Sequence, residues 1–476
     1  MCKGAMLTED NDTIAAISTA PGVGAIGLVR LSGPDSIAIA DRVFVGSKRP
    51  SEMEHSRVQF GRVVRDGAVL DEVMLTVLRS PQSYTGEDVV EISCHGNPLI
   101  LRDVLSAVID AGARLATGGE FTRRAFLRGK MDLCQAEAVM ELLSAQTEEA
   151  KRVALSQVRG RTSQEVARLR EQVIRAKVEL DASIDFPDDV SDEALMGSDT
   201  ARGGSSVKLL LDTARELDAM ISAFAASQQA QRLPTAAIVG KVNVGKSTLL
   251  NALLAEDRVI TSESAGTTRD RIDADLALSS GRRVRLSDTA GLVVPRDELD
   301  VKARVKMEEA VRSADFLIMV FDASSPLEDE DAQLVKTWGA GPAVLVLNKI
   351  DLGERWDPSV LVGKCGDLSQ APVVRTCAIS GLGMDELDGA LDKLLCAVTP
   401  EVPSEACVVG TMRNERLLQR ARDAINAALA ASHTGSWPEF ASSDLAEALG
   451  AFNEFLGIDV GVDILDEIFS RFCIGK

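Results

Sequence analysis

The stretch Gly240-Lys241-Val242-Asn243-Val244-Gly245-Lys246-Ser247 decides the fold of the middle of this chain. It follows an apolar run over residues 236–239 and leads into a helix-like run over 248–254. A strand, a glycine-rich loop and a helix in that order predict a phosphate-binding loop, whose N–H groups and helix N-terminus surround phosphate oxygens. Lys246 is then expected to reach the β- and γ-phosphates, and Ser247 to hold Mg²⁺.

Length and composition narrow the class of protein. The chain has 476 residues, which predicts about three domains rather than one core. A net charge of −20 argues against a broad basic surface for nucleic acid, so a contact with RNA is expected to be local or supplied by a partner. The eight cysteines lack metal-ligand spacing and are interpreted as reduced thiols of a cytoplasmic protein. No signal peptide or membrane-spanning run is expected, and residues 1–11 are predicted to be a disordered lead.

The first part of the chain has mixed periodicity. Strand-like runs cover residues 13–17, 25–31, 73–77 and 89–92, whereas helical periods cover 35–44 and 101–111. These patterns predict an α+β domain over residues 12–130.

A helical composition begins at residue 131, with long helices predicted over 135–159, 162–184 and 207–227. It stops at Pro234 and returns after Pro403. There, one helix is predicted over 414–432. Another is expected to begin at Asp444, with Glu447 placed for a capping box.

The residues expected on the inner face of this last helix are Leu445, Leu449, Phe452 and Leu456. The simplest organisation is a helical bundle domain in two parts, 131–232 and 399–472. Between them lies an inserted domain, 233–398, and a tail, 473–476, ends the chain.

Inside the insert, buried-strand runs cover residues 236–239, 284–286, 316–321 and 343–347, and helical stretches alternate with them. Such alternation predicts an α/β domain with a doubly wound parallel sheet.

Further motifs follow these strands. Asp288-Thr289-Ala290-Gly291 supplies a carboxylate that can bind Mg²⁺ through water and a glycine amide that can sense a γ-phosphate. Gly266-Thr267-Thr268 lies between the loop and this motif, where a threonine completes the coordination of Mg²⁺. In Asn348-Lys349-Ile350-Asp351, the carboxylate of Asp351 can accept two hydrogen bonds from the N–H edge of guanine, and adenine offers neither donor. Cys377-Ala378 stands where a small turn usually contacts guanine O6.

All these motifs in order, each at the end of a strand, predict GTP binding. The expected GTP-contacting residues are Asn243, Val244, Gly245, Lys246, Ser247, Thr248, Ser262, Glu263, Ser264, Ala265, Gly266, Thr267, Thr268, Asp288, Thr289, Ala290, Gly291, Asn348, Lys349, Asp351, Cys377, Ala378 and Ile379.

Hydrolysis needs a further source of charge stabilisation. Leu292 occupies the place where many GTPases have the glutamine that orients the attacking water. The side-chain oxygen of Asn243 suits a monovalent cation, and K⁺ there would stabilise charge at the β–γ bridge. The alternative is that Asn243 only makes a local bond within the turn.

Beyond these motifs, the whole chain from Asp12 to its last residue resembles one family, the tRNA modification GTPases MnmE, also called TrmE. The resemblance is carried by Tyr84-Thr85-Gly86-Glu87-Asp88, His95-Gly96-Asn97-Pro98, Gly119-Glu120-Phe121-Thr122-Arg123-Arg124-Ala125-Phe126, Gln135-Ala136-Glu137-Ala138, Ile184-Asp185-Phe186-Pro187 and Phe472-Cys473-Ile474-Gly475-Lys476. It implies an N-terminal α+β domain that binds folate and dimerises, a helical bundle, and an inserted Ras-like G domain.

The resemblance also implies a function. Members of the family form homodimers whose G domains meet across GTP and K⁺. They work with the flavoprotein MnmG (GidA), in a heterotetramer or larger complex, on C5 of the wobble uridine of certain tRNAs. The added group is aminomethyl or carboxymethylaminomethyl, and 5-formyl- or methylene-tetrahydrofolate is the one-carbon source.

By position, the resemblance assigns the folate contacts to Arg30, Glu91, Lys130 and Lys476. A carboxylate such as Glu91 can pair with donors of a pterin. The alternative interpretations are a salt bridge at the edge of the core for Glu91 and a solvated side chain for Lys130. Cys473 is either a thiol near the one-carbon chemistry or a small residue packed against the folate pocket.

Two departures from the family pattern leave roles open. The glutamate that places the hydrolytic water is replaced by Asp300 at ungapped spacing, or by Glu298 after a local shift. Ser262, Glu263 and Ser264 stand where Thr-Asp-Ile is common, but a backbone carbonyl can ligate K⁺ whatever the side chain. Cys377 replaces a common serine.

The resulting assignments are catalytic roles for Lys246, Thr268 and Asp300 or Glu298, Mg²⁺ ligands at Ser247 and Thr268, and K⁺ ligands at Asn243, Ser262, Ser264 and Thr267.

Two other functions compete with this one. A ribosome-assembly or RNA-checkpoint GTPase would need a basic or KH-like RNA domain, and the sequence has no basic patch of that kind. A folate-dependent one-carbon transferase with a regulatory G domain would act without the flavoprotein.

Overall fold

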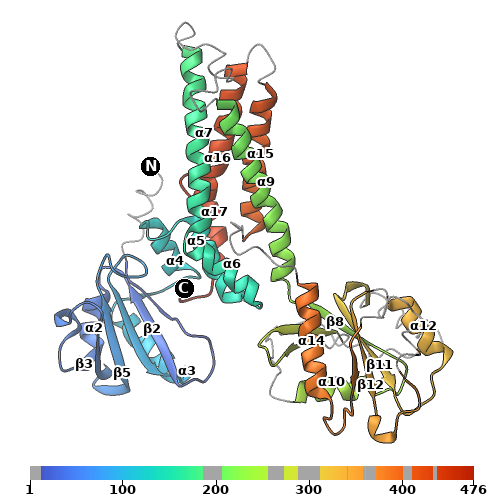
Figure 1. Cartoon of the computed structure of the whole chain (residues 1–476). Helices are drawn as coiled ribbons and strands as arrows, with labels where there is room; N and C mark the ends of the chain where they lie inside the picture. The colour runs from blue at the N-terminus through green and yellow to red at the C-terminus, as the bar shows by residue number, and fades with distance from the viewer. Residues whose placement is uncertain are drawn as a thin grey trace, which may run out of the picture. The chain divides into compact units, whose positions relative to one another are not determined.

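The computed structural model describes residues 12–185, 206–255, 273–287, 311–339, 341–357, 360, 371–399, 410–431 and 437–476. They divide into two compact units. The first is built from residues up to 144, 153–224 and those from 407 onward, and the second from 225–406 together with 145–152. Figure 1 colours both units along the chain. The predicted lead, 1–11, lies outside the described residues.

The N-terminal part of the first unit is a seven-stranded sheet with the order β3-β4-β5-β6-β2-β1-β7. Its strands are β1 (Ile14–Ile17), β2 (Ile26–Ser32), β3 (Phe44–Gly46), β4 (Arg57–Arg65), β5 (Ala68–Leu78), β6 (Val89–His95) and β7 (Arg114–Leu115). All neighbours are antiparallel except β1 and β7. A short 3₁₀ turn, η1 (Pro50–Glu52), precedes β4.

Helices α2 (Ser36–Val43) and α3 (Pro98–Asp110) cover one face of this sheet. The start of α3 is encoded locally, because the side chain of Asn97 accepts a hydrogen bond from the N–H of Leu99 and Pro98 occupies the first turn.

The opposite face of the sheet is covered at one end only. There, α4 (Glu120–Leu127) places Phe121 against Ile14 and Ala16. Farther along this face, Ile26 lies opposite His95 and Phe60 lies opposite Met74. The side chains of Ile26, Val58, Phe60 and Met74 are all exposed. This face therefore carries exposed apolar side chains that nothing in the described part of the chain covers, with Val58, Phe60 and Met74 on neighbouring strands and Ile26 two strands away from Met74.

A buried ion network fastens α4 to the sheet. The guanidinium of Arg124, only 1% exposed, contacts Asp12 at 2.5 Å, Glu120 at 3.1 Å and Glu87 at 3.3 Å. A hydrogen bond from Arg114 lowers the pKa of Asp12. Burial raises the pKa of Glu120 and hydrogen bonding to Arg114 lowers it, with a net decrease. Asp12 and Glu120 are thus charged and paired at neutral pH.

Replacing Arg124 with Met should destabilise this region by about 3–5 kcal/mol, because the buried carboxylates of Glu87 and Glu120 and the partly exposed carboxylate of Asp12 each lose a partner. The measurement is hydrogen exchange across β1 and α4, which should accelerate. The matched control is Arg62→Met, which breaks an exposed pair with Glu72 at 3.3 Å and should cost about 1 kcal/mol or less. Equal protection of α4 in both variants would contradict a stabilising role for the network.

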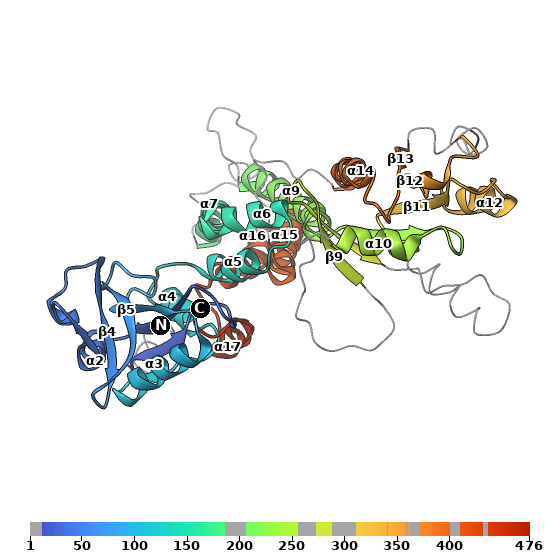
Figure 2. The same cartoon turned by 90° about the horizontal axis from the view of Figure 1, so that it is seen from below.

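The helical part of the first unit contains α5 (Leu133–Ser144), α7 (Arg161–Asp185), α15 (Met412–Ala431), α16 (Trp437–Leu456), α17 (Val462–Ser470) and most of α6 (Glu148–Val158) and α9 (Ser206–Gln231). Residues 148–152 of α6 and 225–231 of α9 are assigned to the second unit. Figure 2 looks along four of them, α7, α9, α15 and α16, whose apolar side chains share one core. Helices from both sides of the insert therefore complete one bundle. Among the described residues, no helix is both long and apolar enough to cross a membrane.

Two helix predictions need correction. The predicted helix over 135–159 is divided into α5 and α6, because the hydroxyl of Thr147 accepts the N–H of Ala150 and begins a new helix. Asp444 does not start a helix, since α16 already runs continuously from Trp437. The predicted inner face of α16 is confirmed: Leu445, Phe452 and Leu456 are buried and Leu449 is partly buried.

Two carboxylates lie one helical turn apart on α5, facing the start of α15. Glu137 is buried and accepts hydrogen bonds from Asn414 at 2.8 Å and from Arg413 at 3.4 Å. Glu141 packs against Gly410, so closely that a side chain at that glycine would collide with its carboxyl oxygens. Burial, and then the negative charge of Glu137, raise the pKa of Glu141 to about 7.

This raised pKa predicts a stability that depends on pH. The folded state keeps the proton of Glu141 more tightly than the unfolded state, so this stabilisation is present below pH 4.5 and is lost as pH rises through about 7. Glu141→Gln should therefore raise the free energy of unfolding at pH 8 by on the order of 1–3 kcal/mol and change little at pH 4.5. Melting temperatures of the parent and of Glu141→Gln, measured from pH 4.5 to pH 8, test this prediction. A difference between the two proteins that stays the same at every pH would contradict it.

The second unit is built on a six-stranded sheet with the order β13-β12-β11-β8-β10-β9. The strands are β8 (Thr235–Val239), β9 (Asp273–Ala277), β10 (Arg283–Ser287), β11 (Phe316–Asp322), β12 (Ala343–Asn348) and β13 (Val373–Arg375). The sheet is parallel except for β9, which is antiparallel to β10 at the edge.

Helices lie on both faces of this sheet. Helices α10 (Lys246–Ala255) and α14 (Met384–Val398) pack on one face, and α12 (Asp329–Trp338) packs on the other. The sheet is therefore doubly wound, and the carboxyl ends of its parallel strands converge on the loops that hold the predicted motifs.

Candidate functional site

The predicted phosphate loop connects β8 to α10, which begins at Lys246. Gly240 is required because a Cβ there would lie 2.3 Å from the carbonyl oxygen of Val320 in the neighbouring strand β11. Gly245 has φ +99°, a conformation that L side chains rarely adopt. The Nζ of Lys246 donates to the carbonyl oxygens of Gly240 at 2.9 Å and Lys241 at 2.7 Å. Its ammonium group is thus held within the loop.

Asn348 connects the phosphate loop to the predicted base-binding turn. Its Nδ2 donates to the carbonyl oxygen of Val244 at 3.0 Å, and its Oδ1 accepts the N–H of Ala378 at 3.1 Å. The side chain of Asn348 is buried, and a Cβ on Gly245 would lie 2.3 Å from its Nδ2. One amide therefore sets the spacing between three segments that are far apart in the sequence.

The other residues of the Asn-Lys-x-Asp motif, and the turn after β13, lie next to the side chain of Asn348. Lys349 donates from Nζ to the carbonyl oxygen of Asn243 at 2.5 Å. Asp351 lies in the short 3₁₀ helix η2 (Ile350–Leu352), where it is exposed. In the turn after β13, Cys377 is buried and Ile379 is exposed. The structure thus gathers the described part of the predicted GTP site at one edge of the sheet.

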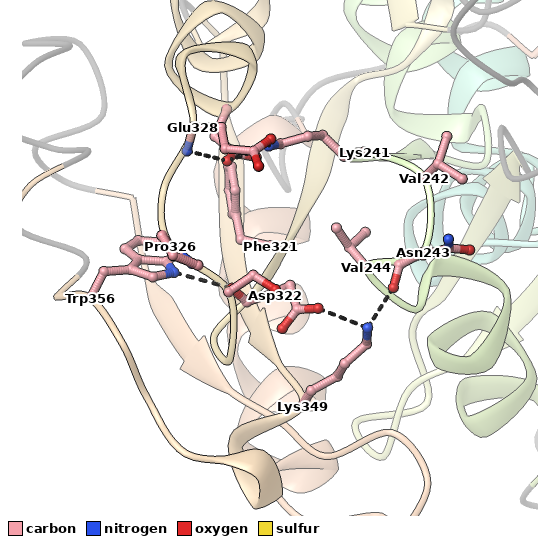
Figure 3. A pocket seen from close by; sticks show the side chains of 12 residues that line it. Lys241, Val242, Asn243, Val244, Phe321, Asp322, Pro326, Glu328, Lys349 and Trp356 are labelled. Atoms are coloured by element: carbon pink, nitrogen blue, oxygen red, sulfur yellow. Dashed lines mark hydrogen bonds and ion pairs between the residues drawn. The ribbon is translucent and has the colours of Figure 1, made fainter.

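The sequence analysis did not identify the acidic residues that form ion pairs with Lys241 of the phosphate loop and with Lys349. Lys241 forms ion pairs with Glu328 at 2.6 Å and Asp331 at 2.8 Å. Asp322 forms one with Lys349 at 2.8 Å. These side chains and Trp356 line a cavity of about 210 Å³ (Figure 3). Asp322 could have been found, because it is the last residue of the buried strand β11 and lies at the edge of the sheet where the motifs gather.

Part of the predicted site lies outside the described residues. This applies to Ser262, Glu263, Ser264, Ala265, Gly266, Thr267, Thr268, Asp288, Thr289, Ala290, Gly291, Glu298 and Asp300. Within the described ranges, no three His, Cys, Asp or Glu side chains gather to form a metal site. The assigned ligands Ser247, at the exposed start of α10, and Asn243 are in the described part of the loop.

Removing the amide of Asn348 should weaken nucleotide binding. Asn348→Ala leaves the buried carbonyl of Val244 and N–H of Ala378 without partners, and we expect the affinity for a fluorescent GDP analogue to fall by about 10- to 100-fold. Asn348→Asp keeps the acceptor for Ala378 but loses the donor to Val244, so its affinity should lie between the two.

Thr337→Ala, on the exposed side of α12, is the control and should bind as the parent does. If Asn348→Ala also bound the GDP analogue as the control does, the bridge would not determine nucleotide binding.

A second group of predicted residues meets on the partly covered face of the N-terminal sheet. Two nitrogens of Arg30 contact Oε1 of Glu91, at 2.8 and 2.9 Å. The guanidinium also lies 5.8 Å from the ring centres of Tyr84 and Phe121. The salt bridge considered for Glu91 is therefore present, and Arg30 is held by it and by two aromatic rings.

The C-terminal tail docks beside this pair. Ile474 pairs with Gly118, and the hydroxyl of Ser18 donates to the carbonyl of Gly475 at 3.0 Å. Gly475 has φ +94°, and a Cβ there would lie 2.3 Å from the carbonyl oxygen of Ile17. Only glycine fits this close approach, which brings the last residue back onto the sheet.

The tail brings Lys476 close to Arg30. Lys476 is half-buried, and burial, then the charge of Arg30, lower its pKa. The thiol of Cys473 is exposed. Lys130 lies on an adjacent loop, where its Nζ donates to the carbonyl of Pro81 at 3.0 Å. Two predicted cations, Arg30 and Lys476, and one predicted carboxylate, Glu91, thus lie close together on this face of the sheet, whereas Lys130 binds the loop that contains Pro81.

The doubly wound sheet, the glycine-rich loop after β8 and the Asn-Lys-x-Asp motif after β12 define a P-loop GTPase, inserted here into a helical domain. Two family models match the chain on either side of this insert, and the range of the second also spans it. "GTP-binding protein TrmE N-terminus" matches residues 13–130, and "MnmE helical domain" matches residues 133–473.

Curated relatives match over nearly the full length. The "tRNA modification GTPase MnmE" of Listeria welshimeri is 37% identical over 470 residues, covering 98% of this chain and 99% of that protein. That of Roseiflexus sp. is 38% identical over 474 residues, with 98% and 99% covered. The chain belongs to the tRNA modification GTPase MnmE family, which confirms the resemblance and favours it over a ribosome-assembly GTPase.

Among solved structures, the Era protein of Aquifex aeolicus is 26% identical, covers 40% of this chain and 67% of its own, and has a TM-score of 0.28. The fold assignment rests on the strand order of this chain, not on that superposition.

Proposed function

We propose that this GTPase acts with a flavoprotein partner of the MnmG kind to modify C5 of the wobble uridine in certain tRNAs, using the one-carbon unit of a tetrahydrofolate. The observation that carries the proposal is the docking of the C-terminal tail, which places Lys476 beside the Arg30–Glu91 pair. The names of the relatives support tRNA as the substrate.

The chemistry of this pocket suits a folate. Both contacts from Arg30 use one carboxyl oxygen of Glu91, so the other oxygen can accept donors of a pterin ring. The cationic groups of Arg30, Lys130 and Lys476 suit the carboxylates of a glutamyl tail. Bound tetrahydrofolate would supply the one-carbon unit, and the exposed thiol of Cys473 lies on the same tail as Lys476.

In the G domain, we assign Lys246 to the β- and γ-phosphates, Ser247 and Thr268 to Mg²⁺, and Asp351 to the guanine edge. Asp300 or Glu298 places the hydrolytic water. Because Leu292 stands at the usual glutamine position, we assign charge stabilisation to K⁺. Its ligands would be Asn243, Ser262, Ser264 and Thr267, and pairing of two G domains would drive hydrolysis.

Homodimer formation fits the open face of the N-terminal sheet. The exposed apolar side chains of Ile26, Val58, Phe60 and Met74 lie on the same face of the sheet as Arg30 and Glu91, and a second copy would bury them. Each pocket would then lie at the margin of the dimer interface.

The test uses the full chain with the flavoprotein, unmodified tRNA, GTP and methylene-tetrahydrofolate. Lys246→Ala should abolish GTP turnover and tRNA modification, because phosphate charge loses its partner, yet leave 5-formyl-tetrahydrofolate affinity unchanged. Glu91→Gln should weaken folate binding by about tenfold or more and spare GTP turnover of the isolated protein. Calorimetry, phosphate release and nucleoside analysis give the three readouts.

Loss of folate binding in Lys246→Ala would contradict separate sites. Modification without the flavoprotein would instead support a transferase that acts alone.

A further inference from the structure

The backbone of the phosphate loop is held in an unusual conformation. Among the described residues, non-glycine residues with positive φ are Ser56, Asp66, Asn243 and Lys349. Two of these four, Asn243 at +65° and Lys349 at +63°, face each other and share a hydrogen bond. An L residue in this region costs on the order of 1 kcal/mol or more and persists only where its surroundings hold it.

What holds Asn243 is a chain of polar contacts that ends on β11. The Nζ of Lys349 donates to the carbonyl oxygen of Asn243 at 2.5 Å and to Oδ2 of Asp322 at 2.8 Å. The N–H and hydroxyl of Ser324 donate to Oδ1 of Asp322, at 2.9 and 2.6 Å. The indole N–H of Trp356 donates to the carbonyl of Asp322 at 3.1 Å. Asp322 is therefore itself fixed on three sides.

The carboxylate of Asp322 is ionised at neutral pH. Burial raises its pKa, but hydrogen bonds from Lys349 and Ser324 outweigh burial and lower the pKa below its ordinary value. The other carboxylates lining the cavity, Glu328 and Asp331, pair with Lys241 instead. Asp322 is thus the carboxylate of this cavity that fixes the ammonium group bound to Asn243.

This arrangement fixes the backbone of Asn243 and with it the direction in which the side chain leaves the loop. Figure 3 shows its backbone carbonyl directed at Lys349 and its side-chain amide directed away from the cavity. Because the carbonyl is held, rotation of the peptide that would turn the amide aside would break the bond to Lys349. The left-handed conformation and the direction of the amide are therefore coupled.

We propose that Asp322 is a positioning residue for the monovalent cation: through Lys349 it holds Asn243 in the left-handed conformation that presents its amide oxygen as a ligand. This inference rests on the proposed K⁺ site at Asn243 and adds the residue that orders it. Asp322 acts on the cation through two other residues and touches neither cation nor nucleotide.

The experiment is a KCl titration of GTP turnover by the full chain, with choline chloride keeping the ionic strength constant. Asp322→Asn removes the charge at constant size. We expect it to raise the K⁺ concentration for half-maximal turnover by about tenfold. The affinity for a fluorescent GDP analogue in NaCl should change by no more than about threefold.

Glu330→Gln is the matched control, because it neutralises an exposed carboxylate of α12 that does not line the cavity. Its K⁺ dependence should equal that of the parent protein. Asp322→Glu retains the carboxylate and should restore a half-maximal K⁺ concentration between those of the parent and Asp322→Asn. If Asp322→Asn does not fold, Asp322→Glu and Ser324→Ala, which loosens Asp322, carry the same comparison.

The outcomes separate the inference from the function it rests on. A parent protein that turns over GTP equally in KCl and NaCl overturns the proposed K⁺ site itself. A K⁺-activated parent with an unchanged K⁺ dependence in Asp322→Asn overturns only the positioning role. If Asp322→Asn loses affinity for the GDP analogue in NaCl to the same extent as it loses the response to K⁺, the positioning role is also overturned. Such a result would show that Asp322 has a general structural role.

Discussion

The site in the second unit depends on one buried amide. Asn348 joins the carbonyl of Val244 to the N–H of Ala378, so the phosphate loop and the base-binding turn cannot move apart without leaving polar groups buried and unpaired. The parallel sheet makes this possible, since β8, β12 and β13 all deliver their carboxyl ends to one edge. The glycine at 245 follows from the same constraint, because the amide occupies the space that a side chain would need.

In the first unit, ion pairs hold α4 on the N-terminal sheet, whereas apolar packing holds α2 and α3 on it. Arg124 is almost fully buried, yet it is surrounded by three carboxylates that neutralise it. The network fixes α4, and α4 in turn places Phe121 under Arg30. The tail completes the pocket from the other end of the chain, so the folate pocket we propose depends on residues separated by almost the entire sequence.

Much of this could be read from local patterns. The glycine loop, the Asn-Lys-x-Asp motif and the apolar runs of β8, β11 and β12 are short-range signals. Strands β3 and β7 are too short to show a period, and β9 is an edge strand with little apolar character. The break between α5 and α6 was missed because one threonine cap outweighs a helical composition. The Asp444 prediction failed for the converse reason, since a good capping sequence sits inside a longer helix.

The sequence by itself determined the class of P-loop GTPase, the interruption of the helical domain by another domain and the family, because these depend on residue types at fixed spacing along the chain. Only the tertiary structure decided which charges meet. The pairing of Asp322 with Lys349, of Arg30 with Glu91, and the return of Lys476 to the first strands all join segments far apart in sequence. No local pattern records such contacts, since strand order and register place those side chains together.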